Sequence, residues 1–112
     1  MKRLTVDMID WEIEALPEDM SVRGNAVVSG NDEQDKEIEG DIIEDLENGN
    51  EWAWCIAKVT GKYNGIEAVE YLGGCSYNSA EDFETGGYLE DMKDEVMKQI
   101  QDMVDRIMAD TK

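Results

Sequence analysis

Residues 51–77 read EWAWCIAKVTGKYNGIEAVEYLGGCSY, and this stretch contains the strongest folding signal in the chain. Asn64-Gly65 separates two segments that are rich in β-branched and aromatic residues. An Asn-Gly pair between two such segments is typical of a two-residue β-hairpin with a type I′ turn. We therefore predict a hairpin in which Tyr63 faces Ile66.

The two cysteines of the chain, Cys55 and Cys75, fall in opposite strands of this hairpin. A regular ladder, counted back from the turn, pairs Cys55 with Gly74 and turns the two thiols to opposite faces of the sheet. A β-bulge at Gly73-Gly74 would shift the register by one residue and bring Cys55 opposite Cys75. Two cysteines make no disulfide framework, so we expect reduced thiols and a cytoplasmic setting.

The aromatic residues of the hairpin allow two interpretations. One face can gather the side chains of Trp52, Trp54, Tyr71 and Tyr77. If helices cover that face, the aromatic residues form the core. If helices cover the face with small residues such as Ala53 and Ala57 instead, the aromatic residues are exposed and form an interface, for example in a homodimer.

The segments before the hairpin read as one strand and one helix. Residues 5–16, TVDMIDWEIEAL, alternate between apolar and acidic residues, which predicts a half-buried strand that Pro17 ends. Residues 17–31 show no clean period and predict a structured loop. Apolar residues at 38, 42, 43 and 46 share one helical stripe, so we predict a helix over 32–47, with Asn31-Asp32 at its start and Asn48-Gly49-Asn50 at its end.

The segments after the hairpin read as a loop followed by a long helix. Residues 78–87, NSAEDFETGG, predict a loop, and apolar residues from Leu89 to Ile107 keep helical spacing, which predicts a helix over about 86–109. The predicted order is β-α-β-β-α in a single domain over 1–112. We expect an α+β fold, a three-stranded antiparallel sheet with both helices packed on one face.

The charge of the chain restricts its partners. Its 28 acidic and 10 basic residues give a formal net charge of −18. Direct binding to nucleic acid or to an anionic membrane is disfavoured, because phosphates attract lysine and arginine. A basic protein surface is the natural complement. We expect neither a signal peptide, because acids interrupt the start of the chain, nor a membrane span.

Residues 32–51, DEQDKEIEGDIIEDLENGNE, concentrate this charge, since ten of the twenty are acidic and only Lys36 is basic. On a helix, Glu33, Glu37, Asp41 and Asp45 form an i, i+4 row whose three like-charge pairs cost about 0.6–1.5 kcal/mol at low salt. Neighbouring carboxylates lie about 5–6 Å apart, comparable to the roughly 3.4 Å per phosphate along one DNA strand. The candidate partner-binding residues are Glu33, Asp35, Glu37, Glu39, Asp41, Glu44, Asp45, Glu47, Trp52 and Trp54.

Two interpretations of these acids stay open. Either they only solvate a surface helix, or they present a polyanion-like surface to a protein that binds nucleic acid, because arginine binds carboxylate and phosphate with the same fork. Trp52 and Trp54, near the end of the helix, could anchor such a contact.

Other chemistries have weaker support. Asp35, Glu37 and Glu39 match the first ligands of a calcium loop, but Leu46 occupies the twelfth position, where a bidentate glutamate belongs. The chain has no histidine, which removes the commonest general base and metal ligand. We therefore predict no catalytic site, no metal and no cofactor.

Four segments resemble small acidic proteins of tailed bacteriophages and prophages. They are RGNAVVSGND (23–32), EWAWCIAKVT (51–60), YLGGCSY (71–77) and GGYLEDMKDE (86–95), and the likeness spans roughly 22–97. Proteins of that class are similar in kind to anti-restriction and anti-CRISPR inhibitors, several of which mimic DNA. The resemblance implies a non-enzymatic inhibitor in the host cytoplasm, and it assigns a role to no single residue.

Overall fold

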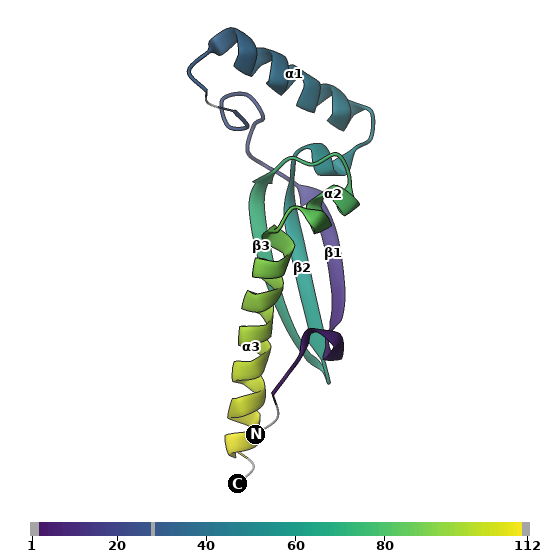
Figure 1. Ribbon diagram of the computed structural model, residues 1–112, viewed down its shortest axis with the longest axis vertical. Helices are drawn as coiled ribbons and strands as arrows, with labels where there is room; N and C mark the ends of the chain where they lie inside the picture. Colours follow the sequence, from purple (N-terminus) through teal and green to yellow (C-terminus); the bar gives the residue numbers. More distant parts are fainter. Residues whose placement is uncertain (1–2, 28, 111–112) are drawn as a thin grey trace.

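The computed structural model describes residues 3–27 and 29–110 and shows an α+β fold (Figure 1). Its elements, in order, are the 3₁₀ turn η1 (Val6–Met8), β1 (Asp10–Pro17), α1 (Asp32–Glu47), the 3₁₀ turn η2 (Glu51–Ala53), β2 (Cys55–Tyr63), β3 (Ile66–Cys75), α2 (Ala80–Thr85) and α3 (Tyr88–Asp110). The predicted three-stranded antiparallel sheet is confirmed, with the order β1-β2-β3.

The predicted β-α-β-β-α order is wrong, because a short helix, α2, forms inside the segment predicted as a loop. The side chain of Ser79 caps this helix by accepting a hydrogen bond from the backbone N–H of Asp82. Phe83 then buries its ring completely, which fixes the helix against the sheet. The order is therefore β-α-β-β-α-α.

The hairpin between β2 and β3 matches the prediction. Asn64 and Gly65 have φ angles of 46° and 82°, as a type I′ turn requires, and Tyr63 pairs with Ile66. The register shifts by one residue between Cys55 and Ala57, and Gly74 there has φ +64°. Cys55 consequently lies opposite Cys75, so the bulge is confirmed and the regular ladder is wrong.

The core lies between the sheet and the helices α2 and α3. Helix α3 lies along β2 and β3 (Figure 1) and covers the face that carries small residues such as Ala57 and Ala68. It approaches the sheet closely at Gly61, where an added Cβ would lie 2.6 Å from Cγ1 of Val96. The sheet therefore uses small residues in its central strand to admit a long helix.

Helix α1 is where the predicted packing fails. It spans the predicted residues, Asp32–Glu47, but lies beyond one end of the sheet instead of on its face (Figure 1). Among the helices and strands, α1 chiefly contacts η2. Its apolar residues Ile38, Ile42, Ile43 and Leu46 are only half-buried and lie outside the core between the sheet and helices α2 and α3. The molecule is elongated as a result, 63 × 26 × 22 Å, with a radius of gyration of 17.8 Å. A compact chain of this length would have about 13 Å.

Within the described residues, no helix has an apolar stretch long enough to cross a membrane.

Candidate acidic interaction surface

Helix α1 presents the acidic row, and local signals define its ends. The side chain of Asn31 accepts a hydrogen bond from the N–H of Gln34 at 3.2 Å, and Asp32 and Glu33 add negative charge to the first turn, where the helix dipole favours it. Asn48 follows the last turn and Gly49 then adopts φ +98°, which ends the helix. The row therefore stands on a regular helix of 16 residues.

The structure exposes most of the predicted carboxylates. All four members of the row are exposed, and so are Glu44 and Glu47. The row runs from Glu33 to Asp45, a rise of about 18 Å along the helix, which matches about five phosphates of one DNA strand. Asp32 and Glu51 are also exposed and extend the surface beyond the residues named from the sequence.

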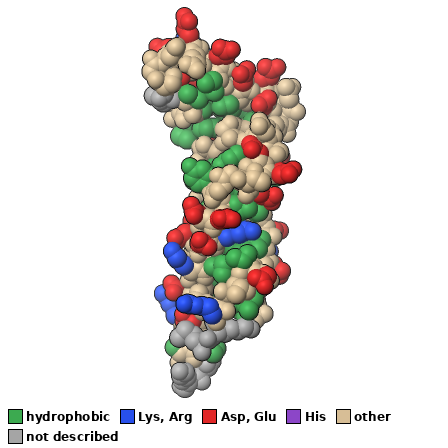
Figure 2. Space-filling model, viewed as in Figure 1, with side chains coloured by type: hydrophobic (Ala, Val, Ile, Leu, Met, Phe, Trp, Pro, Cys, Tyr) green, Lys and Arg blue, Asp and Glu red, His purple; other side chains and the backbone are tan. Residues whose placement is uncertain are grey.

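In the described part of the chain, the carboxylates of the row form no ion pairs, and Lys36 is the only basic residue on α1. Within residues 3–27 and 29–110, no ion pair involves the row, Glu44 or Glu47. The last turn of α1 contains no basic residue, so its acids face the negative end of the helix dipole, which is unfavourable. Figure 2 shows the same asymmetry, because lysine and arginine side chains in that view appear only in the half of the molecule away from α1. The acids thus cost α1 stability and create a concentrated negative field.

Glu39 does not belong to this exposed surface. Its side chain is 6% exposed, accepts a hydrogen bond from the N–H of Gly24 at 2.5 Å and pairs with Arg23 at 3.5 Å. The loop between β1 and α1 therefore folds over α1 and uses this carboxylate as its attachment point. Asp35 is half-buried and bonds to Ser29, which leaves it a smaller role at the surface.

The two tryptophans are also not exposed anchors, because they precede β2 instead of lying on the hairpin face. Trp54 is 6% exposed, and its indole Nε1–H donates to the carbonyl of Met20 at 2.7 Å. Trp52 is half-buried and stacks on Phe83, with ring centroids 5.1 Å apart. Of the four aromatic residues considered for one face, only Tyr71 is largely exposed, at 59%. Helices cover the small-residue face, as the second interpretation expected, but Trp52, Trp54 and Tyr77 are not exposed, so the four aromatic residues do not form an exposed patch.

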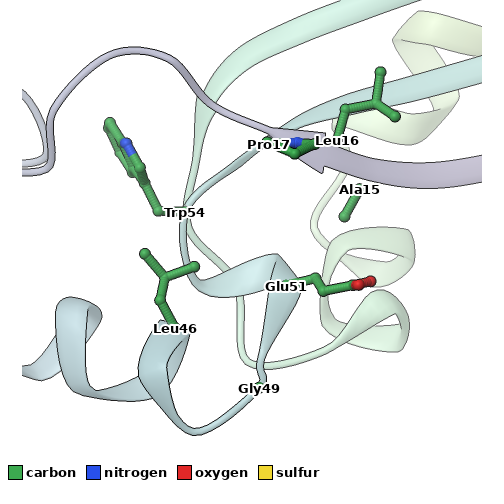
Figure 3. A pocket seen from close by; sticks show the side chains of 7 residues that line it. All are labelled: Ala15, Leu16, Pro17, Leu46, Gly49, Glu51 and Trp54. Carbon is green, nitrogen blue, oxygen red and sulfur yellow. The ribbon is translucent and has the colours of Figure 1, made fainter.

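A pocket of about 300 Å³ lies where α1 meets the sheet (Figure 3). Leu46 of α1 points toward Trp54 across this space, and Leu16 and Pro17 at the end of β1 form another side (Figure 3). Glu51 adds a carboxylate to a mainly apolar lining. The pocket adjoins the last turn of the acidic helix, so an apolar side chain could enter it beside the charges.

The acids of β1 behave differently from those of α1. Asp10, Glu12 and Glu14 lie on the open face of the sheet, where Glu12 pairs with Lys62 at 3.5 Å and Glu14 with Lys58 at 3.9 Å. Lysines therefore neutralise two of these three acids, unlike the acids of the row on α1.

Cys55 and Cys75 are buried, and their thiols are poorly reactive. Burial raises the pKa of Cys55 to about 12, with contributions from Cys75 and Glu18, and burial also raises the pKa of Cys75. Both thiols are free, and at neutral pH they are protonated and poorly nucleophilic. Within the described residues, no group of three or more cysteine and acidic side chains is arranged to hold a metal ion.

No protein-family model matches the chain, and neither the curated proteins nor the solved structures include a significantly similar one. The functional argument therefore depends on the geometry and charge of the molecule.

Proposed function

We propose that the protein is a non-enzymatic inhibitor that binds the basic nucleic-acid-binding surface of a host defence complex, CRISPR–Cas or restriction, by imitating a polyanion. The observation that carries the proposal is the position of α1. Its exposed carboxylate row lies beyond the end of the sheet, on a helix with nine acids and one basic residue, Lys36 (Figures 1 and 2). The defence complex as target, and the cytoplasm as location, rest on the resemblance to phage proteins.

The shape of the molecule supports this use of the charge. A single helix about 10–12 Å in diameter at the end of an elongated body can enter a groove that a broad sheet cannot. Residues 18–51, which we call the acidic arm, contain 12 acidic and 2 basic residues and so carry −10 of the −18 charge. Such a field steers a basic partner toward the arm and makes association sensitive to salt.

The decisive experiment reverses two charges of the row. In Glu37→Lys with Asp41→Lys, the net charge changes by four and two attractive contacts become repulsive. A control with the same change in charge reverses Glu90 and Asp94, which are exposed at the same spacing on α3. The assay is inhibition of DNA binding by purified defence complexes at about 0.1 M and about 0.5 M salt, with circular dichroism to confirm folding.

We expect the reversal on α1 to weaken inhibition by at least about tenfold, and the reversal on α3 to weaken it far less. Equal effects of the two reversals would mean that only total charge matters. Inhibition that survives the α1 reversal would show that the row is a solvated helix face.

The alternative, an accessory protein that acts through an apolar interface with its acids only solvated, loses its aromatic hairpin face in this structure. One observation still favours an apolar interface, namely the exposed hydrophobic residues at the opposite end of the molecule.

A further inference from the structure

The end of the molecule opposite α1 gathers exposed apolar side chains. Helix α3 continues its apolar stripe into its last turns, where Met103, Ile107 and Met108 are 38%, 52% and 47% exposed. Val6 and Met8 of η1, at the same end of the sheet, are 44% and 42% exposed (Figure 1). These five are most of the eight large hydrophobic residues that are exposed in the described part of the chain.

The apolar side chains at this end also border a groove. A hollow of about 290 Å³ lies between the hairpin turn and α3, and Tyr63, Ile66, Val104 and Ile107 contribute to its lining. The apolar end of α3 in one molecule can fill the apolar groove of a second molecule, so two copies present matching surfaces to each other. Exposed apolar clusters of this sort are typical of protein interfaces.

The charge at this end identifies the occupant. We call residues 3–8, 61–67 and 97–109 the neutral end, because these ranges contain four acidic and four basic residues. Two of the basic residues, Lys62 and Lys98, form ion pairs with Glu12 and Glu95 at its border. A basic partner is attracted to the acidic arm, which carries −10, and gains nothing at the neutral end. A second copy of this acidic chain is repelled by the arm, and the neutral end is where it can approach without that repulsion.

We propose that the neutral end is a homodimer interface, at which a second copy docks through the same residues about a twofold axis. A twofold interface uses one patch on both subunits, and here Ile107 and Met103 of each copy pack against the other. Because the molecule is elongated, this arrangement leaves the two acidic arms at opposite ends of the dimer, free to engage partners. The inference is independent of the identity of the basic target.

The test is sedimentation equilibrium of the full chain over a wide range of concentration, at about 0.1 M and about 0.5 M salt. We expect a reversible dimer that becomes stronger at high salt, because screening reduces repulsion between two acidic copies. Ile107→Ser combined with Met103→Ser should weaken dimerisation by at least about tenfold. Tyr71→Ser, which removes an equally exposed side chain on the open sheet face, should leave it unchanged.

A cross-linking variant provides a second readout. The native cysteines are buried, so Ile107→Cys supplies an accessible thiol near the proposed axis, and mild oxidation should join two copies through it. Tyr71→Cys should not cross-link at the same concentration. A monomer at all concentrations and both salts, or a dimer that persists in the double variant, would overturn the proposal.

Discussion

Glu39 and Glu37 offer a direct test of how the structure divides the acids of α1. The two residues are identical and two positions apart on one helix, but Glu39 is buried under the loop and Glu37 is exposed in the row. We compare Glu39→Gln with Glu37→Gln, which remove the same charge and preserve the size of the side chain. We expect the two substitutions to change stability in opposite directions.

The expected magnitude for Glu39→Gln follows from its two contacts. The N–H of Gly24 keeps an acceptor, but the bond changes from charge-assisted to neutral, which costs about 1 kcal/mol. The ion pair with Arg23 is also lost, and because Arg23 is 56% exposed its contribution is at most about 1 kcal/mol. The free energy of unfolding should therefore fall by about 1–2 kcal/mol.

Glu37→Gln removes two like-charge pairs instead. Glu33 and Asp41 lie four residues to either side, and each repulsion costs about 0.2–0.5 kcal/mol. The free energy of unfolding should rise by about 0.4–1 kcal/mol. Urea unfolding followed by circular dichroism measures both changes, and hydrogen exchange of residues 18–27 shows whether the loop detaches in Glu39→Gln. If both variants shift stability in the same direction, Glu39 is solvated like Glu37 and does not hold the loop through Arg23 and Gly24.

Three further predictions concern packing, pH and salt. In urea titrations, Gly61→Ala should lower the free energy of unfolding by about 1–2 kcal/mol, because the added Cβ collides with Val96. Gly40→Ala in α1 should raise it by up to about 1 kcal/mol, because the added Cβ meets no neighbouring atom within 4 Å and alanine favours a helix. Because the pKa of Cys55 rises from 9.0 to about 12 on folding, its contribution to stability is complete below pH 9 and is lost between pH 9 and about 12. In unfolding curves across that range, Cys55→Ala should reduce the fall of the free energy of unfolding with pH. Raising salt from about 0.1 M to about 0.5 M should raise the melting temperature of the wild type, and an unchanged value would mean that repulsion between the acids is negligible.

Elements with strong local signals could be predicted from the sequence. The hairpin turn follows from Asn64-Gly65, and α1 begins and ends at the predicted residues because Asn31 caps it and Gly49 stops it. The bulge that pairs the cysteines was one of two open alternatives, because Gly73-Gly74 permits a bulge without requiring one. Helix α2 was missed although Ser79 and Asp82 form its cap, because its six residues are too few to show a helical period.

The placement of α1 could not be predicted, because its apolar stripe shows only that some surface covers it. The stripe predicts burial against the sheet or against a loop equally well, and here the covering surface includes the preceding loop, fixed by Glu39 and by the indole of Trp54. Glu39 carries no distinguishing signal among nine acids in 16 residues. Residues 51–63 read as one continuous strand, so Trp54 was assigned to the hairpin. In the structure the 3₁₀ turn η2 replaces the start of that strand, and Trp54 precedes β2.

The separation of charge along the molecule makes its two proposed contacts distinguishable by salt alone. Binding of a basic partner to the acidic arm depends on attraction between opposite charges, so salt should weaken it. Association of two copies at the neutral end depends on apolar burial and works against repulsion between acidic molecules, so salt should strengthen it. If α1 packed on the face of the sheet, as the sequence predicted, its acids would lie close to the neutral end. Salt would then affect partner binding and self-association through the same charges. In the proposed dimer, the position of α1 beyond the sheet would keep the acidic arms of the two copies apart while their neutral ends meet.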